Sequence, residues 1–145
     1  MIGGPPKLGY VLRYHYDWSE RTADAHASTQ KERPAVVVLA VARHRERFLV
    51  RVAPVTHRPP DDAARAIEIP APVKARLGLD GDRSWIILDH ANEFVWPGPD
   101  VRPVPGRAPA TIYYGPLPPS LFASVRKQLF GLLKTGRLRG LFRRA

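Results

Sequence analysis

The strongest constraint on the fold is a continuous apolar run at residues 34–41, in which four of the eight residues are valine. A strand that faces water on one side alternates apolar and polar residues. An unbroken β-branched run is instead typical of a strand buried on both faces. The run therefore predicts a central strand, against which the other elements must pack.

Shorter strand patterns lie on both sides of this run. Residues 9–18 alternate aromatic with aliphatic or polar side chains, which predicts a half-buried strand, and residues 19–33 are polar without an apolar period, which predicts a long loop. Residues 47–56 resume a strand pattern and are expected to form a hairpin with the central strand. Further short strands are expected at residues 66–69, 84–89 and 93–96, with a helical turn at 72–77 that ends at Gly78.

Prolines and one amphipathic pattern dominate the last third of the chain. Eight prolines fall within residues 97–119, which excludes a helix or a sheet interior and predicts an extended connector over the barrel. Ser120 is a suitable N-cap for a helix that runs to about Thr135 and ends at Gly136. Its apolar stripe comprises Leu121, Phe122, Val125, Leu129, Leu132 and Leu133.

The order of these elements indicates the fold class. Strands follow one another in meander order without βαβ alternation, which argues against a parallel sheet. We expect a mainly β protein, a small and strongly bent antiparallel barrel with a C-terminal α-helix packed on it. The domain is expected to occupy residues 1–136, followed by a basic tail at residues 137–145.

The charge is distributed unevenly along the chain. The formal net charge is +10, and residues 101–145 hold nine basic and no acidic side chains. This asymmetry indicates a polyanionic partner, which is a nucleic acid, an anionic membrane or an acidic protein segment. The chain has no cysteine, no metal-ligand spacing among its five histidines and no apolar run of membrane-spanning length. We therefore expect a cytoplasmic protein without metal, cofactor or membrane span.

Several segments occur together in an order that resembles the MazF/PemK family of plasmid-maintenance toxins, which includes Kid. The segments are Gly-Tyr-Val-Leu at residues 9–12, Arg-Pro before the valine run within 30–38, and a strand ending in Pro-Val-Thr at 52–56. A later strand at residues 84–89 ends near an aspartate, and the terminal helix falls where the family has one. The resemblance spans roughly residues 8–135.

The resemblance implies an SH3-like barrel of the CcdB/MazF type that forms a homodimer. It implies a toxin of a type II toxin-antitoxin system, a metal-independent endoribonuclease that cleaves single-stranded RNA. The 2′-hydroxyl would attack the phosphate and leave a 2′,3′-cyclic phosphate. A cognate antitoxin with an acidic disordered segment would neutralise the activity.

The chemistry implied by the resemblance needs a proton acceptor, a cation for the phosphorane and an acid for the leaving oxygen. Arg33 is the candidate cation, and Thr56 is the candidate hydrogen-bond donor to a phosphate or base edge. His57 is the candidate proton-transfer group, while Asp89 matches an aspartate that acts as general base in part of the family. The family pairs that aspartate with an arginine at the position held here by Ile87. Candidate RNA-binding residues are Gln30, Lys31, Arg58 and Asn92.

Two alternative functions stay open at this point. One is a gyrase-directed toxin on the same barrel, resembling CcdB, and the order of the Arg-Pro and Pro-Val-Thr segments argues against it. The other is a non-catalytic barrel that binds RNA or a protein partner, which the isoleucine at position 87 favours.

Overall fold

The structure is a computed structural model of the 145-residue chain, and it describes residues 4–17, 30–98, 101–134 and 143–144. In chain order the elements are β1 (Tyr10–Asp17), β2 (Gln30–Ala42), η1 (His44–Glu46), β3 (Phe48–Thr56), η2 (Ala63–Arg65), β4 (Ala66–Glu68), α1 (Ala71–Leu77), β5 (Trp85–Ile87), β6 (Asn92–Trp96), β7 (Tyr113–Pro116), α2 (Pro119–Lys134) and β8 (Arg143–Arg144).

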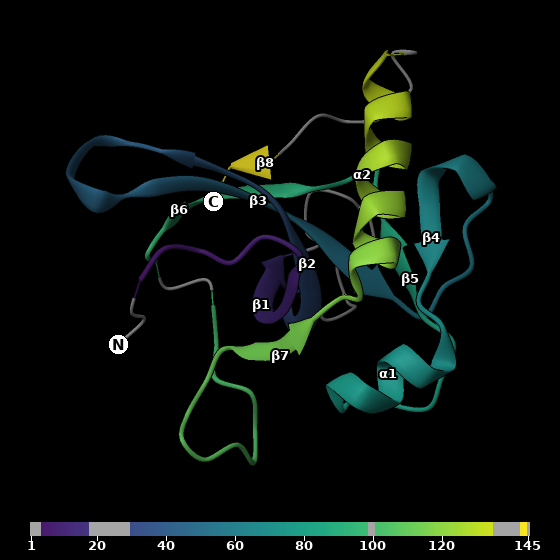
Figure 1. Cartoon of the computed structure of the whole chain (residues 1–145), viewed down its shortest axis with the longest axis horizontal. Coiled ribbons are helices and arrows are strands. Elements are labelled where there is room, and N and C mark those ends of the chain that lie inside the picture. Colours follow the sequence, from purple (N-terminus) through teal and green to yellow (C-terminus); the bar gives the residue numbers. More distant parts are fainter. Residues whose placement is uncertain (1–3, 18–29, 99–100, 135–142, 145) are drawn as a thin grey trace.

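The strands form one curled sheet in the order β4-β5-β3-β2-β1-β7 (Figure 1). Strand β3 pairs with β5 through its C-terminal end and with β6 through its N-terminal half, so the sheet divides there. Neighbouring strands along this order run antiparallel, and α2 packs across the open side of the curl. The expected fold class is confirmed: the protein is a mainly β, antiparallel half-barrel with a C-terminal helix.

Strand β2 is the central strand that the valine run predicts. It pairs with β1 on one side and β3 on the other, and its residues 35–38 are buried. Val36 and Val38 enter one apolar cluster, whereas Val37 enters a second cluster on the opposite face. Both faces of the strand therefore lie against apolar side chains, which explains why its sequence does not alternate.

The two clusters differ in composition. The first is aliphatic and includes Val125 and Leu132 of α2 with Leu77 of α1, so it fixes both helices to the sheet. The second combines aliphatic residues with three large rings, Tyr14, Phe94 and Trp96, and is called the aromatic cluster after them. The ring centroids of Tyr14 and Phe94 lie 5.1 Å apart, and those of Phe94 and Trp96 lie 6.3 Å apart.

Two expected loops contain strand residues, and both expectations were wrong there. Residues 30–33 belong to β2, because their backbone pairs with residues 14–17 of β1 and this pairing needs no apolar side chains. The proline-rich stretch contains β7, which pairs with β1 at the edge of the sheet. An edge strand has a partner strand on one side only, so some of its backbone N–H groups form no hydrogen bond in the sheet. Pro116, which has no N–H, is therefore tolerated there.

The C-terminal helix differs from expectation at its first residue and in its buried stripe. It begins at Pro119 rather than after a Ser120 cap, as proline is favoured in the first helical turn. Leu133 is 47% exposed, so the buried stripe is narrower than the sequence predicts. Thr135, Gly136 and most of the basic tail lie outside the described residues, and Arg143–Arg144 pairs in parallel with β6. Among the described residues, no helix combines the length and hydropathy that a membrane span requires.

We expect Phe94→Ala to lower the free energy of unfolding by about 3–5 kcal/mol, because Phe94 is 1% exposed and its loss leaves a cavity between two aromatic rings. The matched control is Val95→Ala on the same strand, where the side chain is 42% exposed and the cost should be about 1 kcal/mol or less. Chemical denaturation of both variants measures the difference. Equal losses would contradict the assignment of the aromatic cluster as core.

Candidate active site

A cavity of about 190 Å³ opens where the end of β3 meets the loop that follows α1. Its walls come from four parts of the chain: β2, the end of β3, the α1 region and β7. The lining residues are Arg33, Pro34, Val55, His57, Lys74, Gly78, Leu79, Asp80, Ser84 and Tyr114. Two candidate catalytic residues, Arg33 and His57, are thus brought together from segments more than 20 residues apart.

Arg33 is placed by the central strand. It pairs with Tyr14 of β1, two residues before the position at which Ala35 pairs with Pro54 of β3. Pairing with β1 fixes the base of the guanidinium side chain, and Arg33 lines the cavity together with His57, Lys74 and Asp80. Guanidinium geometry suits bidentate contact with phosphate oxygens.

Lys74 is the residue of this cavity that the sequence pattern did not reveal. It is 4% exposed, and its ammonium donates hydrogen bonds to Asp80 Oδ1 at 2.6 Å, to Ser84 Oγ at 2.5 Å and to the backbone carbonyl of Asp82. Three acceptors match the three donors of an ammonium group, so its charge is compensated inside the protein. The polar run of residues 80–84 directly after a helix end was the available signal.

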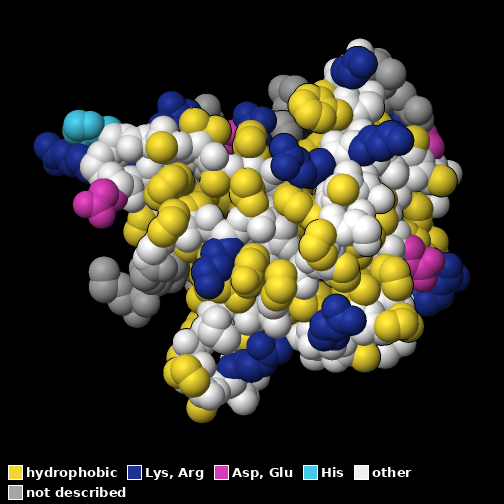
Figure 2. Space-filling model, viewed as in Figure 1, with side chains coloured by type: hydrophobic (Ala, Val, Ile, Leu, Met, Phe, Trp, Pro, Cys, Tyr) yellow, Lys and Arg dark blue, Asp and Glu magenta, His cyan; other side chains and the backbone are white. Residues whose placement is uncertain are grey.

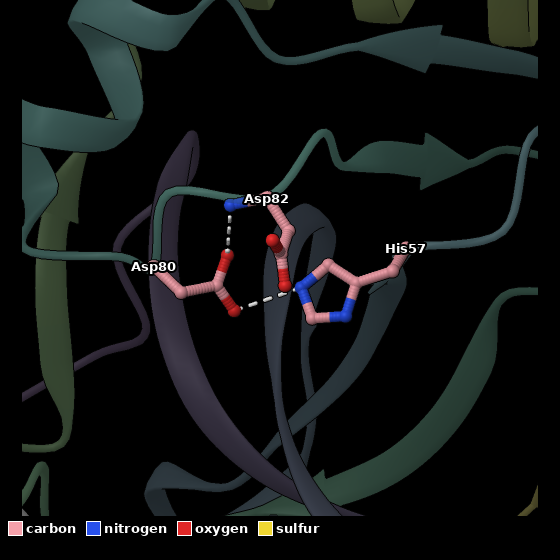
Figure 3. A group of neighbouring side chains, drawn as sticks. All are labelled: His57, Asp80 and Asp82. Atoms are coloured by element: carbon pink, nitrogen blue, oxygen red, sulfur yellow. Dashed lines mark hydrogen bonds and ion pairs between the residues drawn. The ribbon is translucent and has the colours of Figure 1, made fainter.

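His57 contacts the other oxygen of the same carboxylate. Its Nε2 lies 2.8 Å from Asp80 Oδ2, and the backbone N–H of Asp82 donates to Asp80 Oδ1 at 3.2 Å (Figure 3). The hydrogen bond from Lys74 is the main cause that lowers the pKa of Asp80 below its ordinary value, with a further contribution from His57, while burial acts in the opposite direction. Asp80 is therefore ionised at neutral pH and accepts hydrogen bonds from both neighbours.

His57, Asp80 and Asp82 place their ligand atoms within 4.8 Å of one another, which is close enough to hold a metal ion. The ammonium of Lys74, however, already bonds Asp80 Oδ1 and the Asp82 carbonyl. A divalent cation there would lie against a like charge at short range. We therefore interpret the group as a hydrogen-bonded charge cluster and assign no metal to it.

Tyr114 forms part of the cavity wall from β7. Burial raises the pKa of its phenol above the ordinary value, so the hydroxyl is neutral at neutral pH and serves as a hydrogen-bond donor. The guanidinium of Arg107 lies 5.9 Å from its ring centroid and donates to its backbone carbonyl at 3.3 Å. These contacts hold β7 beside the cavity.

Thr56 and Arg58 flank His57 along the chain but are outside the set that lines the cavity. Thr56 ends β3, as the sequence predicts, and its Oγ1 accepts a hydrogen bond from the backbone N–H of Arg58 at 3.2 Å. Gln30 and Lys31 begin β2, on the same strand as Arg33.

Two other candidates lie elsewhere in the structure. Asp89 is buried and pairs at 3.1 Å with Arg65, a residue of η2. Asn92 is 5% exposed, and its side-chain amide donates to the Tyr14 hydroxyl at 3.3 Å. This burial separates Asn92 from any surface that an RNA base can reach.

This protein resembles a solved structure, but its sequence matches no family model and no curated protein. A chain of the crystal structure of MazE-MazF (Form-III) from Deinococcus radiodurans aligns with a TM-score of 0.51 and 21% identity, covering 89% of this chain and 96% of that chain. The protein has a MazF-like fold.

The charge cluster generates a prediction about acid stability. A carboxyl whose pKa is lowered by folding contributes stability above the ordinary aspartate pKa of about 4, and this contribution is lost as the pH falls through the lower folded value. Asp80→Asn should therefore be less stable than the wild type at pH 7, with the difference shrinking below about pH 4. Denaturation across this pH range measures it.

The control for this experiment is Asp61→Asn, because Asp61 is exposed. This variant should follow the wild-type curve throughout. A stability difference for Asp80→Asn that stays constant from neutral to acid pH would show that the ionised Asp80 does not stabilise the fold.

Proposed function

We propose that the protein is a toxin-type, metal-independent endoribonuclease that cleaves single-stranded RNA and is neutralised by a cognate antitoxin. The observation that carries the proposal is the meeting of Arg33 and His57 in one cavity of a MazF-like fold. A guanidinium can supply the cation, and an imidazole the proton transfer, that phosphodiester cleavage without a metal requires.

The proposed reaction is an internal transesterification. The neutral imidazole of His57 removes the proton of the 2′-hydroxyl while the 2′-oxygen forms a bond to phosphorus. Arg33 stabilises the extra negative charge of the phosphorane. The bond from phosphorus to the 5′-oxygen then breaks, and the imidazolium returns the proton to that oxygen. The products are a 2′,3′-cyclic phosphate and a free 5′-hydroxyl.

The remaining candidates have supporting roles in this proposal. The hydroxyl of Thr56 accepts a bond from the backbone and still has a proton to donate to a phosphate oxygen. Gln30, Lys31 and Arg58 contribute to RNA binding in this proposal. Asp89, which is paired with Arg65, has a structural role.

An antitoxin partner is supported by the structural neighbour, which is described as MazE together with MazF. The excess of basic residues in the C-terminal third suits an acidic segment as well as RNA. Figure 2 shows Lys and Arg side chains spread over one face of the molecule, with few Asp or Glu side chains among them. We further propose that the protein acts as a homodimer in the cytoplasm, as the sequence resemblance implies.

We expect the wild-type protein to cleave single-stranded RNA in EDTA, and Arg33→Ala to reduce the rate by about 10²–10³-fold because one preorganised charge donor is lost. Single-turnover assays at saturating RNA, with identification of the new termini, measure this. Arg76→Ala is the matched control, since Arg76 is an exposed residue of α1 and its loss removes the same charge.

The same assay separates the alternative functions. A folded wild-type protein that binds RNA without cutting it would favour the non-catalytic barrel. A protein that neither binds nor cuts RNA but inhibits gyrase would favour the CcdB-like function. Cleavage by Arg33→Ala at the wild-type rate would remove Arg33 from the mechanism.

A further inference from the structure

A network of five hydrogen-bonded groups ends at the His57 imidazole. Ser84 and the Asp82 carbonyl hold the ammonium of Lys74, Lys74 holds one oxygen of Asp80, and the second oxygen of Asp80 meets His57 Nε2. The proposed function uses His57 alone and does not explain why a buried ammonium should be connected to it.

We infer that Asp80, fixed by the buried ammonium of Lys74, is a positioning residue that orients the His57 imidazole for proton transfer to and from RNA. The inference rests on the proposed function and goes beyond it by assigning Asp80 and Lys74 to the proton-transfer step.

The buried Lys74 distinguishes the pair of His57 and Asp80 from an ordinary surface ion pair. The side chains of His57 and Asp80 are 51% and 53% exposed, and exposed pairs hold their geometry weakly. The Lys74 side chain is 5% exposed and makes three hydrogen bonds, so its ammonium has one position. Asp80 is thereby fixed even though half of its side chain faces water.

The loop that carries Asp80 is held by its backbone as well. Gly78 ends α1 in a left-handed conformation with φ of 75°, and its N–H and that of Leu79 bond back to carbonyls of the last helical turn. This turn directs residues 80–84 back toward α1, so that Asp82 and Ser84 reach Lys74. Asp80 is therefore a rigid partner for His57, which lies in a segment without regular secondary structure.

The hydrogen bond also selects the tautomer of the imidazole. An ionised carboxylate only accepts hydrogen bonds, so Nε2 of His57 carries the proton and the lone pair lies on Nδ1. Nδ1 is then the atom that takes the 2′-hydroxyl proton and later returns it to the 5′-oxygen. While the ring is protonated, Asp80 stabilises its positive charge. The charged groups around the ring are Asp80 and Asp82 from the loop, Lys74 from α1 and Arg33 from β2.

A double-mutant cycle tests the inference with the full-length protein and a single-stranded RNA in EDTA. His57→Ala should lower kcat by about 10²–10⁴-fold, as expected for loss of a general acid–base group. Asp80→Asn should lower kcat by about tenfold or more while KM stays within about threefold, because Asp80 acts on the imidazole rather than on RNA binding. In the His57→Ala background, Asp80→Asn should have no further effect on kcat.

Three further variants sharpen the assignment. Lys74→Met should lower kcat in the way Asp80→Asn does, since the carboxylate loses its anchor. Asp80→Glu should restore part of the rate by returning a carboxylate. Asp61→Asn, which removes an exposed carboxylate, should cut RNA like the wild type. Thermal unfolding confirms that each variant is folded, and if Lys74→Met does not fold, the cycle of His57 and Asp80 decides.

The possible failures are distinct. An equal loss of kcat from Asp80→Asn with and without His57 would show that Asp80 acts independently of the imidazole and overturn the inference. A wild-type rate for Asp80→Asn would also overturn it while leaving the endoribonuclease function intact. A folded wild-type protein that leaves RNA uncut would overturn the proposed function, and the inference with it.

Discussion

The fold and the site both depend on the double-sided burial of β2. This strand pairs with β1 and β3 along its edges and separates the aliphatic cluster from the aromatic one across its faces. A strand held in four directions has little freedom to slip, because a shift of one residue would exchange Val36 and Val37 between clusters of different shape. Arg33 lies three residues before Val36, so the strand that both clusters hold also positions the proposed phosphorane-stabilising cation.

The opposite wall of the cavity is held by side-chain packing rather than by strand pairing. Helix α1 has only seven residues, too few to be stable by itself, and it is fixed by Val73 and Leu77 in the aliphatic cluster. Close packing continues at Gly115 of β7, where a Cβ atom would lie 2.9 Å from the Leu77 side chain. Only glycine allows this approach, so β7 and α1 meet tightly beside the cavity.

Local patterns predicted the fold better than they predicted the site. The valine run, the Gly78 helix stop and the single late helix each depend on neighbouring residues, and the structure confirms them. Strand β7 depends on pairing with β1 near the other end of the chain, and the cavity depends on Arg33, His57 and Lys74 coming together from separate segments, which periodicity does not register. Family resemblance led to Arg33, whereas His57 was proposed from the proton-transfer chemistry of its imidazole. Asn92, proposed as an RNA-binding residue, is buried, and its amide bonds the Tyr14 hydroxyl.

A stability argument alone does not explain the Lys74 cluster. Moving an ammonium out of water costs several kcal/mol, and a well-packed apolar side chain in its place is often neutral or stabilising. Lys74 is one of three buried residues of α1, and the other two, Val73 and Leu77, are aliphatic. What an aliphatic residue would not provide is a fixed charge that reaches Asp80 at the rim of the cavity. The cluster therefore gives the site geometric order at some expense in folding free energy, a balance typical of residues selected for chemistry.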